Sequence, residues 1–281
     1  MKFTKKIIAG ISAVLLAVCC VPANLFQENA DAAVDDNNDD WLHVEGNKIL
    51  DMNGNEVWLT GANWFGFNCS ENVFHGAWVD VRTIIKSIAD HGINVVRVPI
   101  STELLLSWMN GTPNPVSSVT ATNNPPYYVV NPEFVVEGTT KDVKNSMEIF
   151  DACMAMFKEY GIKIIVDIHS PDANNSGHNY ELWYNDEFST EDWINSLAWL
   201  AEKYKNDDTI VGYDLKNEPH GSRGYDEEVP ELFAKWDDST DLNNWKYAAE
   251  RCGKAILEAN PNALIIVEGT QQYPKTDEGY T

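Results

Sequence analysis

The stretch YDLKNEPHG, Tyr213–Gly221, decides the fold, because strand-like residues lead there into a charged run that ends at a proline. The apolar residues from Ile210 onward are typical of a buried strand. Pro219 cannot donate a ladder hydrogen bond and favours an extended backbone at Glu218, so the strand is predicted to end at Glu218. A carboxylate at the end of a buried strand must be paired or must act on a ligand.

Strand-like and helix-like segments alternate around this stretch. Strands are predicted at 57–64, 94–100, 163–169, 210–218 and 263–269, and helices at 81–92, 141–161, 190–207 and 242–261. Thr190 is the predicted cap of the third helix. Each helical pattern separates two nearly continuous apolar strands, which predicts a parallel sheet covered by helices. Asn53-Gly54 between apolar residues predicts a small N-terminal β-hairpin ahead of the first strand.

Polar and aromatic residues gather where the predicted strands end. They are Asn63, Trp64, Arg97, His169, Asn217, Glu218 and Glu268. Functional residues collected from the carboxyl ends of many strands are typical of a (β/α)8 TIM barrel. A doubly wound sheet also binds ligands at this edge, so it stays open as an alternative. No glycine-rich phosphate loop follows the first strand, which argues against a nucleotide fold.

Side-chain alternation puts Asp214, Lys216 and Glu218 on one face of the fourth strand, which is the interior of a barrel. One interpretation is a structural layer of ion pairs. The other is a general acid whose pKa is raised by burial and by nearby carboxylates. Glu218 at the rim is the candidate acid, whereas Asp214 and Lys216 fit a structural role.

Two basic residues end the neighbouring strands. Arg97 could hold a carboxylate ionised through paired hydrogen bonds, or it could be a structural partner of Asp214. His169 has Asp167 two residues before it on the same face. No further His or Cys has metal-ligand spacing, so we expect a hydrogen-bonding histidine in a polar pocket and no metal or cofactor.

Aromatic residues crowd the predicted loops. They are Trp64, Phe65, Phe67, Phe74, His75 and Trp78 after the first strand, and Trp108, Tyr127, Tyr128, Trp183 and Tyr184 later on. Rings beside carboxylates suit flat, neutral, hydroxyl-rich ligands such as sugars. Trp193, Trp199 and Trp245 fall within helical patterns and are expected to pack those helices.

In these residues the chain resembles glycoside hydrolase family 5, in particular its secreted bacterial endoglucanases. The matching stretches are GANWFGFN, HGAW, INVVRVPIS, IIVDIHSPD, LWYND, VGYDLKNEPHG and LIIVEGTQQY. The resemblance implies a (β/α)8 barrel and a retaining endo-β-1,4-glucanase acting on cellulose or a related β-glucan. Glu218 would be the general acid/base and Asn217 would bind the sugar 2-hydroxyl. The expected substrate-binding residues are Arg97, His169, Asn217, Trp64, His75 and Trp183.

A retaining glycosidase needs a second carboxylate about 5–5.5 Å from the first. In the family this is a glutamate in a Gly-Glu-Phe/Trp-Gly motif that ends the seventh strand, and the sequence contains no such motif. Glu268 ends the adjacent strand, about 4.8 Å away, and is the remaining second-carboxylate candidate. The resemblance does not assign it that role.

Only five strand–helix units are legible, whereas a barrel closes with eight. We therefore expect the N-terminal portion of an endoglucanase, a barrel truncated after about five strands that lacks its nucleophile and is inactive. An open arc would expose its outer strand edges and the apolar floor beneath. The alternatives are a carbohydrate-binding or vestigial fragment without hydrolysis, or a family 5 enzyme for another β-glycan such as mannan or xyloglucan.

The first residues are typical of an export signal. Lysines precede an apolar run from Ile7 to about Phe26, and Ala30-Asp31-Ala32 forms a cleavage site. We predict a signal peptide at 1–32, a polar leader at 33–40 and a partial catalytic domain at 41–281 of a secreted protein. The length of the apolar run leaves an uncleaved transmembrane anchor as the alternative.

Charge and cysteine content narrow the partners further. The formal net charge of −23 repels nucleic acid and anionic membranes, so neither is expected as a partner once the signal is cleaved. Cys69, Cys153 and Cys252 follow the predicted signal, and their odd number without short spacing argues against a disulfide framework or a zinc site. The sequence does not predict an oligomeric state.

Overall fold

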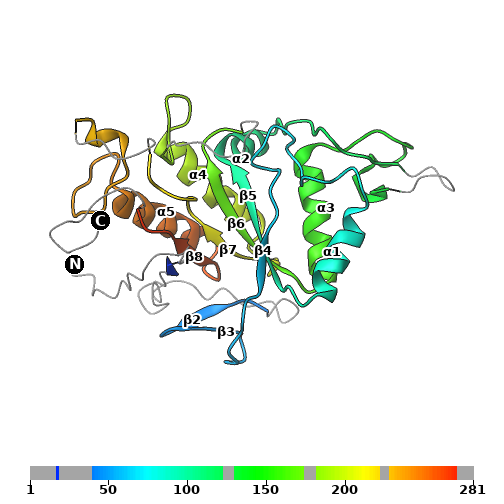
Figure 1. Cartoon of the computed structure of the whole chain (residues 1–281), viewed down its shortest axis with the longest axis horizontal. Helices are drawn as coiled ribbons and strands as arrows, with labels where there is room; N and C mark the ends of the chain where they lie inside the picture. Colours follow the sequence, from blue (N-terminus) through cyan, green and yellow to red (C-terminus); the bar gives the residue numbers. More distant parts are fainter. Residues whose placement is uncertain (1–16, 19–39, 123–129, 174–181, 222–227, 271–281) are drawn as a thin grey trace.

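The computed structural model describes residues 17–18, 40–122, 130–173, 182–221 and 228–270 (Figure 1). Its centre is a parallel sheet of β4 (Gly61–Asn63), β5 (Val95–Ser101), β6 (Lys163–Ser170), β7 (Ile210–Asp214) and β8 (Leu264–Val267). These strands pair in chain order, each beside its predecessor. A doubly wound sheet reverses its order at a switch point, so the observed order matches the wall of a barrel instead.

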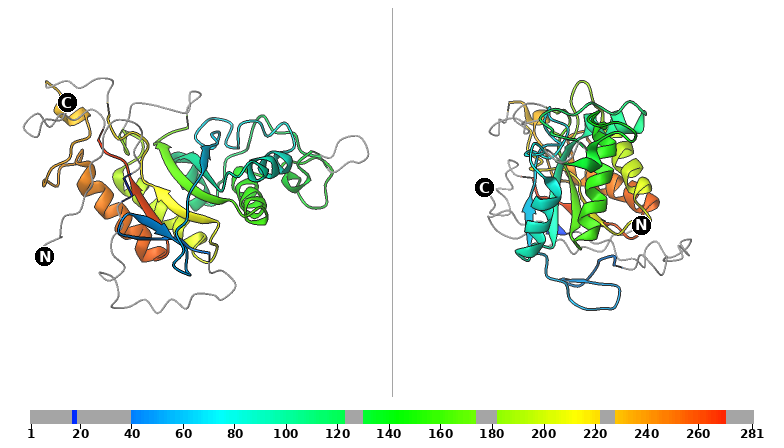
Figure 2. Two further views of the ribbon diagram at one scale, coloured as in Figure 1. Left: turned by 60° about the horizontal axis from the view of Figure 1, so that its bottom comes forward. Right: turned by 90° about the vertical axis from the view of Figure 1, so that its right-hand side faces the viewer.

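In the described ranges, five α-helices lie in the connections between these strands. They are α1 (Val81–Asp90), α2 (Thr102–Met109), α3 (Ser146–Glu159), α4 (Thr190–Lys203) and α5 (Trp245–Ala259), with 3-10 turns at Pro132–Phe134 and Pro230–Leu232. The four predicted helices are present, and α2 was not predicted. Helices α1 and α3 lie side by side at one end of the sheet, and α4 and α5 at the other (Figures 1 and 2).

Short polar side chains explain where the helices begin. Ser189, rather than the predicted Thr190, caps α4: its hydroxyl accepts from the Asp192 N–H, and the Asp192 carboxylate accepts from the Ser189 N–H. This capping box satisfies backbone donors that a helix leaves free at its first turn. Ser101 is both the last residue of β5 and the cap of α2, so no break in the sequence pattern separates that strand from its helix.

Side-chain alternation divides the sheet into two faces. On β5, Val96, Val98 and Ile100 belong to the main core that the strands share with the helices. Val95 lies on the opposite face, where it packs with Ile165 and Ile266. This second face is the barrel interior, and its apolar residues form the floor of the site.

The floor is buried, so the expectation that it would be exposed is wrong. Val95, Ile165 and Ile266 each have less than a tenth of their surface exposed. Hairpin residues cover the start of β7 and β8, where Val44, Ile49 and Val57 pack against Val211 and Leu264. Figure 1 shows this hairpin projecting below the sheet.

The expectation that the last strand would have a free edge is also wrong. The backbone of β1 (Ala17–Val18) pairs antiparallel with Val267 and Ile266 of β8. These two residues lie within the segment 1–32 that is predicted as a signal peptide. At the other end of the order, β4 has β5 as its one neighbour among the described strands.

The N-terminal hairpin pairs β2 (His43–Glu45) with β3 (Lys48–Leu50). The predicted turn at Asn53-Gly54 is confirmed and follows directly, since Leu50 bridges to Glu56 across it. The Asp51 carboxylate accepts backbone hydrogen bonds from Asn53 and Asn55, which stabilises the turn. Within the described ranges, no helix combines the length and the apolar character needed to cross a membrane.

Candidate active site

Arg97 joins three strands on the interior face of the sheet. It is the third residue of β5 (Val95–Ser101), so the prediction that it ends its strand is wrong. Its guanidinium lies 3.0 Å from Asp167 Oδ2 on β6 and 2.7 Å from Asp214 Oδ2 on β7. Both carboxylates are fully buried, and the two aspartates are direct neighbours in the β6–β7 register. The interpretation of Arg97 as a structural partner of Asp214 is therefore confirmed.

Burial and like charge make this cluster strongly coupled. Burial raises the pKa of Asp214 well above its ordinary value, and the Asp167 charge raises it further, whereas Arg97 opposes both effects. Burial disfavours the cationic form of Arg97, but the charges of Asp167 and Asp214 outweigh that effect and raise its pKa. Arg97 is thus held as a permanent cation between two carboxylates.

Arg97 also contacts the rim of the site, which is formed by the residues at the carboxyl ends of the strands, above the two aspartates. Its Nη2 donates to Asn217 Oδ1 at 3.1 Å and to Glu268 Oε1 at 3.2 Å. Arg97 therefore bonds a third carboxylate, that of Glu268, in addition to its two aspartate partners. One side chain therefore brings together Asn217 and Glu268, which are 51 positions apart in the printed sequence.

Glu218 lies beyond the end of its strand. β7 ends at Asp214, so the predicted strand 210–218 was too long. The φ of Glu218 is +43°, which contradicts the extended backbone predicted ahead of Pro219. Left-handed backbone at a residue with a side chain is strained and persists only where its surroundings hold it, often at functional sites. Glu218 is partly exposed, as a group that reaches a ligand must be.

Glu268 lies directly beneath Glu218. Its Oε2 accepts the Glu218 backbone N–H at 2.9 Å, while its Oε1 accepts from Arg97. The Trp245 indole donates to the Glu268 carbonyl at 2.7 Å and holds the backbone there. Glu268 does approach Glu218, as adjacent strands predict, but both of its carboxylate oxygens are engaged.

His169 is the hydrogen-bonding histidine that was predicted. Its Nδ1 lies 2.7 Å from Asp167 Oδ2, and its side chain retains some exposure. Because the same Oδ2 atom contacts Arg97, one carboxylate orients both residues. Within the described ranges there is no group of His, Cys, Asp and Glu side chains arranged to hold a metal ion.

Lys216 contacts the rim from below, in keeping with the structural role that sequence analysis gave it. It is fully buried on the interior face, as the alternation predicted. Its Nζ donates to the backbone carbonyls of His169 at 3.0 Å and Asn217 at 2.6 Å. Burial lowers the pKa of Lys216 to about 8, and the surrounding carboxylates, led by Asp167, limit that fall. Only the position of a charge in the strand pattern pointed to it.

Trp64 and His75 lie together in the loop after β4. The Trp64 indole donates to the His75 carbonyl at 2.9 Å, and its ring packs against Phe74 with the centroids 4.4 Å apart. The His75 ring is exposed and stacks on Phe65 at 4.6 Å. Trp78 meets His75 edge to face at 4.9 Å, so these residues form an aromatic loop surface.

Trp183 is not a surface residue, and its predicted substrate-binding role is contradicted by its burial. The side chain has no exposed area. Its ring packs 5.1 Å from Trp245 and 6.1 Å from Trp193, and its indole donates to Thr190 Oγ1. The predicted packing role of the helical tryptophans Trp193 and Trp245 is confirmed.

Of three other predicted loop aromatics, one was misplaced and two lie outside the described residues. Trp108 lies within α2 and is buried, with its indole donating to Ser146 Oγ. Tyr127 and Tyr128 lie outside the described residues.

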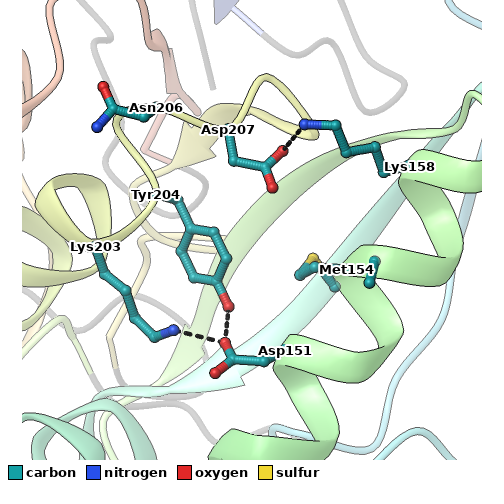
Figure 3. A pocket seen from close by; sticks show the side chains of 8 residues that line it. Asp151, Met154, Lys158, Lys203, Tyr204, Asn206 and Asp207 are labelled. Carbon is teal, nitrogen blue, oxygen red and sulfur yellow. Dashed lines mark hydrogen bonds and ion pairs between the residues drawn. The ribbon is translucent and has the colours of Figure 1, made fainter. Parts of the chain in front are cut away.

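A groove of about 420 Å³ lies elsewhere, between α3 and the end of α4 (Figure 3). Lys203 donates to Asp151 at 2.6 Å, and Lys158 lies 3.3 Å from Asp207. Residues 203–207 of this groove come just before β7 in the chain, so the groove lies at the amino end of the strands. Glu218 lies at the opposite, carboxyl end. Its charges are paired with one another, and it is not the candidate site.

Comparison with known proteins agrees with this geometry. Residues 50–279 match the family model Cellulase (glycosyl hydrolase family 5). Endoglucanase G of Acetivibrio thermocellus is 67% identical over 100% of this chain and 51% of its own length. The chain spans about half the length of the curated relatives it matches.

Solved structures show the same similarity. The hyperthermophilic endocellulase of Pyrococcus horikoshii aligns with a TM-score of 0.71 and 30% identity, over 87% of this chain and 61% of the endocellulase. A cellotetraose complex of that endocellulase aligns with a TM-score of 0.67 and 29% identity, over the same shares. The strand order therefore represents part of a TIM barrel, and the chain belongs to glycosyl hydrolase family 5, the cellulase family.

Proposed function

We propose that this chain carries the glucan-binding rim and the acid/base group of a retaining endo-β-1,4-glucanase that acts on cellulose or a related β-glucan. The observation that carries the proposal is the arrangement of Asn217 and Glu218 above Arg97. Asn217 accepts a hydrogen bond from Arg97. Glu218 is held next to it in a strained backbone at the carboxyl end of β7. The cellotetraose bound by the endocellulase supports a β-1,4-glucan as ligand.

Each rim residue has a chemical role in this proposal. Glu218 protonates the glycosidic oxygen as the bond breaks and then deprotonates the incoming water, which is commonly worth about 10²–10⁴-fold in rate. Since Asn217 Oδ1 accepts from Arg97, its Nδ2 group is the donor that it presents to a sugar hydroxyl. His169, oriented by Asp167, lines the same subsite in this proposal.

Glu268 serves in this proposal as a support for Glu218 and not as the attacking carboxylate. Its two oxygens accept hydrogen bonds, one from Arg97 and one from the Glu218 N–H, and these bonds turn the carboxylate toward the backbone of Glu218. Because a retaining glycosidase needs a second carboxylate that attacks, this orientation favours a second candidate function for the described residues, namely glucan binding without cleavage.

We also propose that residues 1–32 are an export signal, followed by a leader at 33–40 and the family 5 domain at 41–281. The lysines, the apolar run and the Ala30-Asp31-Ala32 site support this division. The strongly acidic charge supports a neutral glucan as partner rather than nucleic acid or membrane. Mass spectrometry of the exported chain is expected to find Ala33 as its first residue.

Two measurements on the full chain test the function. Titration calorimetry with cellotetraose is expected to detect binding by the wild type and by Glu218→Gln, because the substitution keeps the shape of the rim. An absence of cellotetraose binding by the wild type would contradict the proposal. Release of reducing sugar from carboxymethyl cellulose, lost in Glu218→Gln, would instead show that this chain completes the reaction, and Glu268→Gln would then identify the attacking group.

A further inference from the structure

The peptide group between Asn217 and Glu218 is held at both of its polar atoms by charged side chains. Its carbonyl, on Asn217, accepts from Lys216 Nζ at 2.6 Å. Its N–H, on Glu218, donates to Glu268 Oε2 at 2.9 Å. Hydrogen bonds to ionised groups are stronger than those between neutral groups, so this peptide plane is fixed more firmly than an ordinary turn.

This attachment explains the unusual backbone of Glu218. A φ of +43° in front of a proline places a side-chain-bearing residue where its Cβ is crowded. Without external restraint such a residue moves to an extended conformation. The orientation of the peptide plane sets φ, so Lys216 and Glu268 together hold the backbone that aims the Glu218 carboxyl.

Among the described residues, Lys216 contacts backbone carbonyls and not a carboxylate. Its ammonium is fully buried, and within the described part of the chain it forms no ion pair with a carboxylate at contact distance. Its donors go to the carbonyls of Asn217 and His169 instead. A lysine that merely neutralised the buried carboxylates would place its Nζ against one of them.

We propose that Lys216 and Glu268 are positioning residues that clamp the Asn217–Glu218 peptide and thereby aim the Glu218 carboxyl at the glycosidic oxygen. Lys216 also ties the end of β6, through the His169 carbonyl, to the turn after β7. The inference rests on the proposed function for its purpose, but the clamp itself is a property of the unliganded protein and can be measured without a sugar.

Hydrogen exchange of the Glu218 amide tests the clamp. In Lys216→Met and in Glu268→Gln, the Glu218 amide is expected to exchange at least about tenfold faster than in the wild type, since one of its two restraints is lost or weakened. Lys163→Met is the matched control, because Lys163 also donates to a backbone carbonyl, that of Asp208, but at the opposite end of β6. Lys163→Met is expected to leave the exchange rate of the Glu218 amide unchanged.

A second measurement separates this inference from the proposed function. Cellotetraose affinity is expected to fall about tenfold in Lys216→Met and to stay unchanged in Lys163→Met. If the wild type binds no cellotetraose, the proposed function fails while the exchange data still decide the clamp. Unchanged Glu218 exchange in both clamp variants, or equal acceleration in Lys163→Met, overturns the inference. Glu268→Gln preserves shape, so it decides the question even if Lys216→Met does not fold.

Discussion

Asp167 Oδ2 lies 2.7 Å from Nδ1 of His169, and the carboxylate has no exposed surface. A carboxylate oxygen accepts, so Nδ1 of His169 is the donor in this contact. The same oxygen contacts Arg97, which ties the orientation of the histidine ring to the buried cluster. The buried carboxylate of Asp167 thus orients both His169 and Arg97.

Removing the cation from this cluster should be costly. Arg97→Met leaves Asp167 and Asp214 buried without their shared partner, and loss of one member of a buried pair costs about 3–5 kcal/mol. Asp214→Asn should cost less, because it removes a charge that Asp167 repels and retains an acceptor for Arg97. Urea unfolding of the two variants measures the difference. Equal losses would contradict the assigned role of Arg97.

Releasing the strain at Glu218 should stabilise the protein while removing its function. Glu218→Gly lets the backbone keep φ +43° without a crowded Cβ, so the free energy of unfolding is expected to rise by about 1 kcal/mol. Glu218→Ala is the control, since it removes the carboxyl and keeps the Cβ. Chemical denaturation compares the two, and a glycine variant no more stable than the alanine variant would disprove the strain.

The stability contributed by Lys216 should depend on pH in a defined direction. Its folded pKa is lowered from 10.5 to about 8, so above pH 8 the unfolded chain binds a proton that the folded chain has lost. The contribution of Lys216 to the free energy of unfolding therefore rises with pH between about 8 and 10.5. The part of this range from pH 8 to pH 9.5 is about 1.5 pH units wide, which corresponds to about 2 kcal/mol.

Urea unfolding at pH 7 and pH 9.5 measures this contribution. The wild type is expected to gain about 2 kcal/mol over Lys216→Met between the two values. Lys163→Met controls for the removal of a lysine as such, since its side chain reaches the surface and pairs with Asp40. Parallel pH profiles for the wild type and Lys216→Met would show that the buried ammonium does not titrate in this window.

Trp183 should behave as a core residue. Trp183→Ala removes a fully buried ring from between Trp193 and Trp245 and is expected to lower the free energy of unfolding by about 3–5 kcal/mol. Trp78→Ala, at an exposed ring, is expected to change it by less than about 0.5 kcal/mol. Thermal unfolding followed by circular dichroism compares them. A Trp183 variant of unchanged stability would restore its predicted surface role.

The order of strands and helices could be predicted from local pattern. Apolar strands, helical periodicity and capping residues act over a few positions. Four of the five α-helices and all five parallel strands of the described residues were therefore found. Alternation along a strand likewise put Asp214 and Lys216 inside the barrel. The exception among the helices, α2, follows β5 without a break in apolar character, and pattern alone could not separate them.

The details of the site depend on residues far apart in the chain. Glu218 takes its backbone conformation from Glu268, 50 positions later, and not from its neighbour Pro219. Trp183 is buried because Trp193 and Trp245, on two different helices, pack against it. Local preferences amount to a few kcal/mol at most, and buried charges and close packing outweigh them once the strands are assembled. Sequence therefore specified which residues stand at the rim, while their contacts across strands specified what each one can do there.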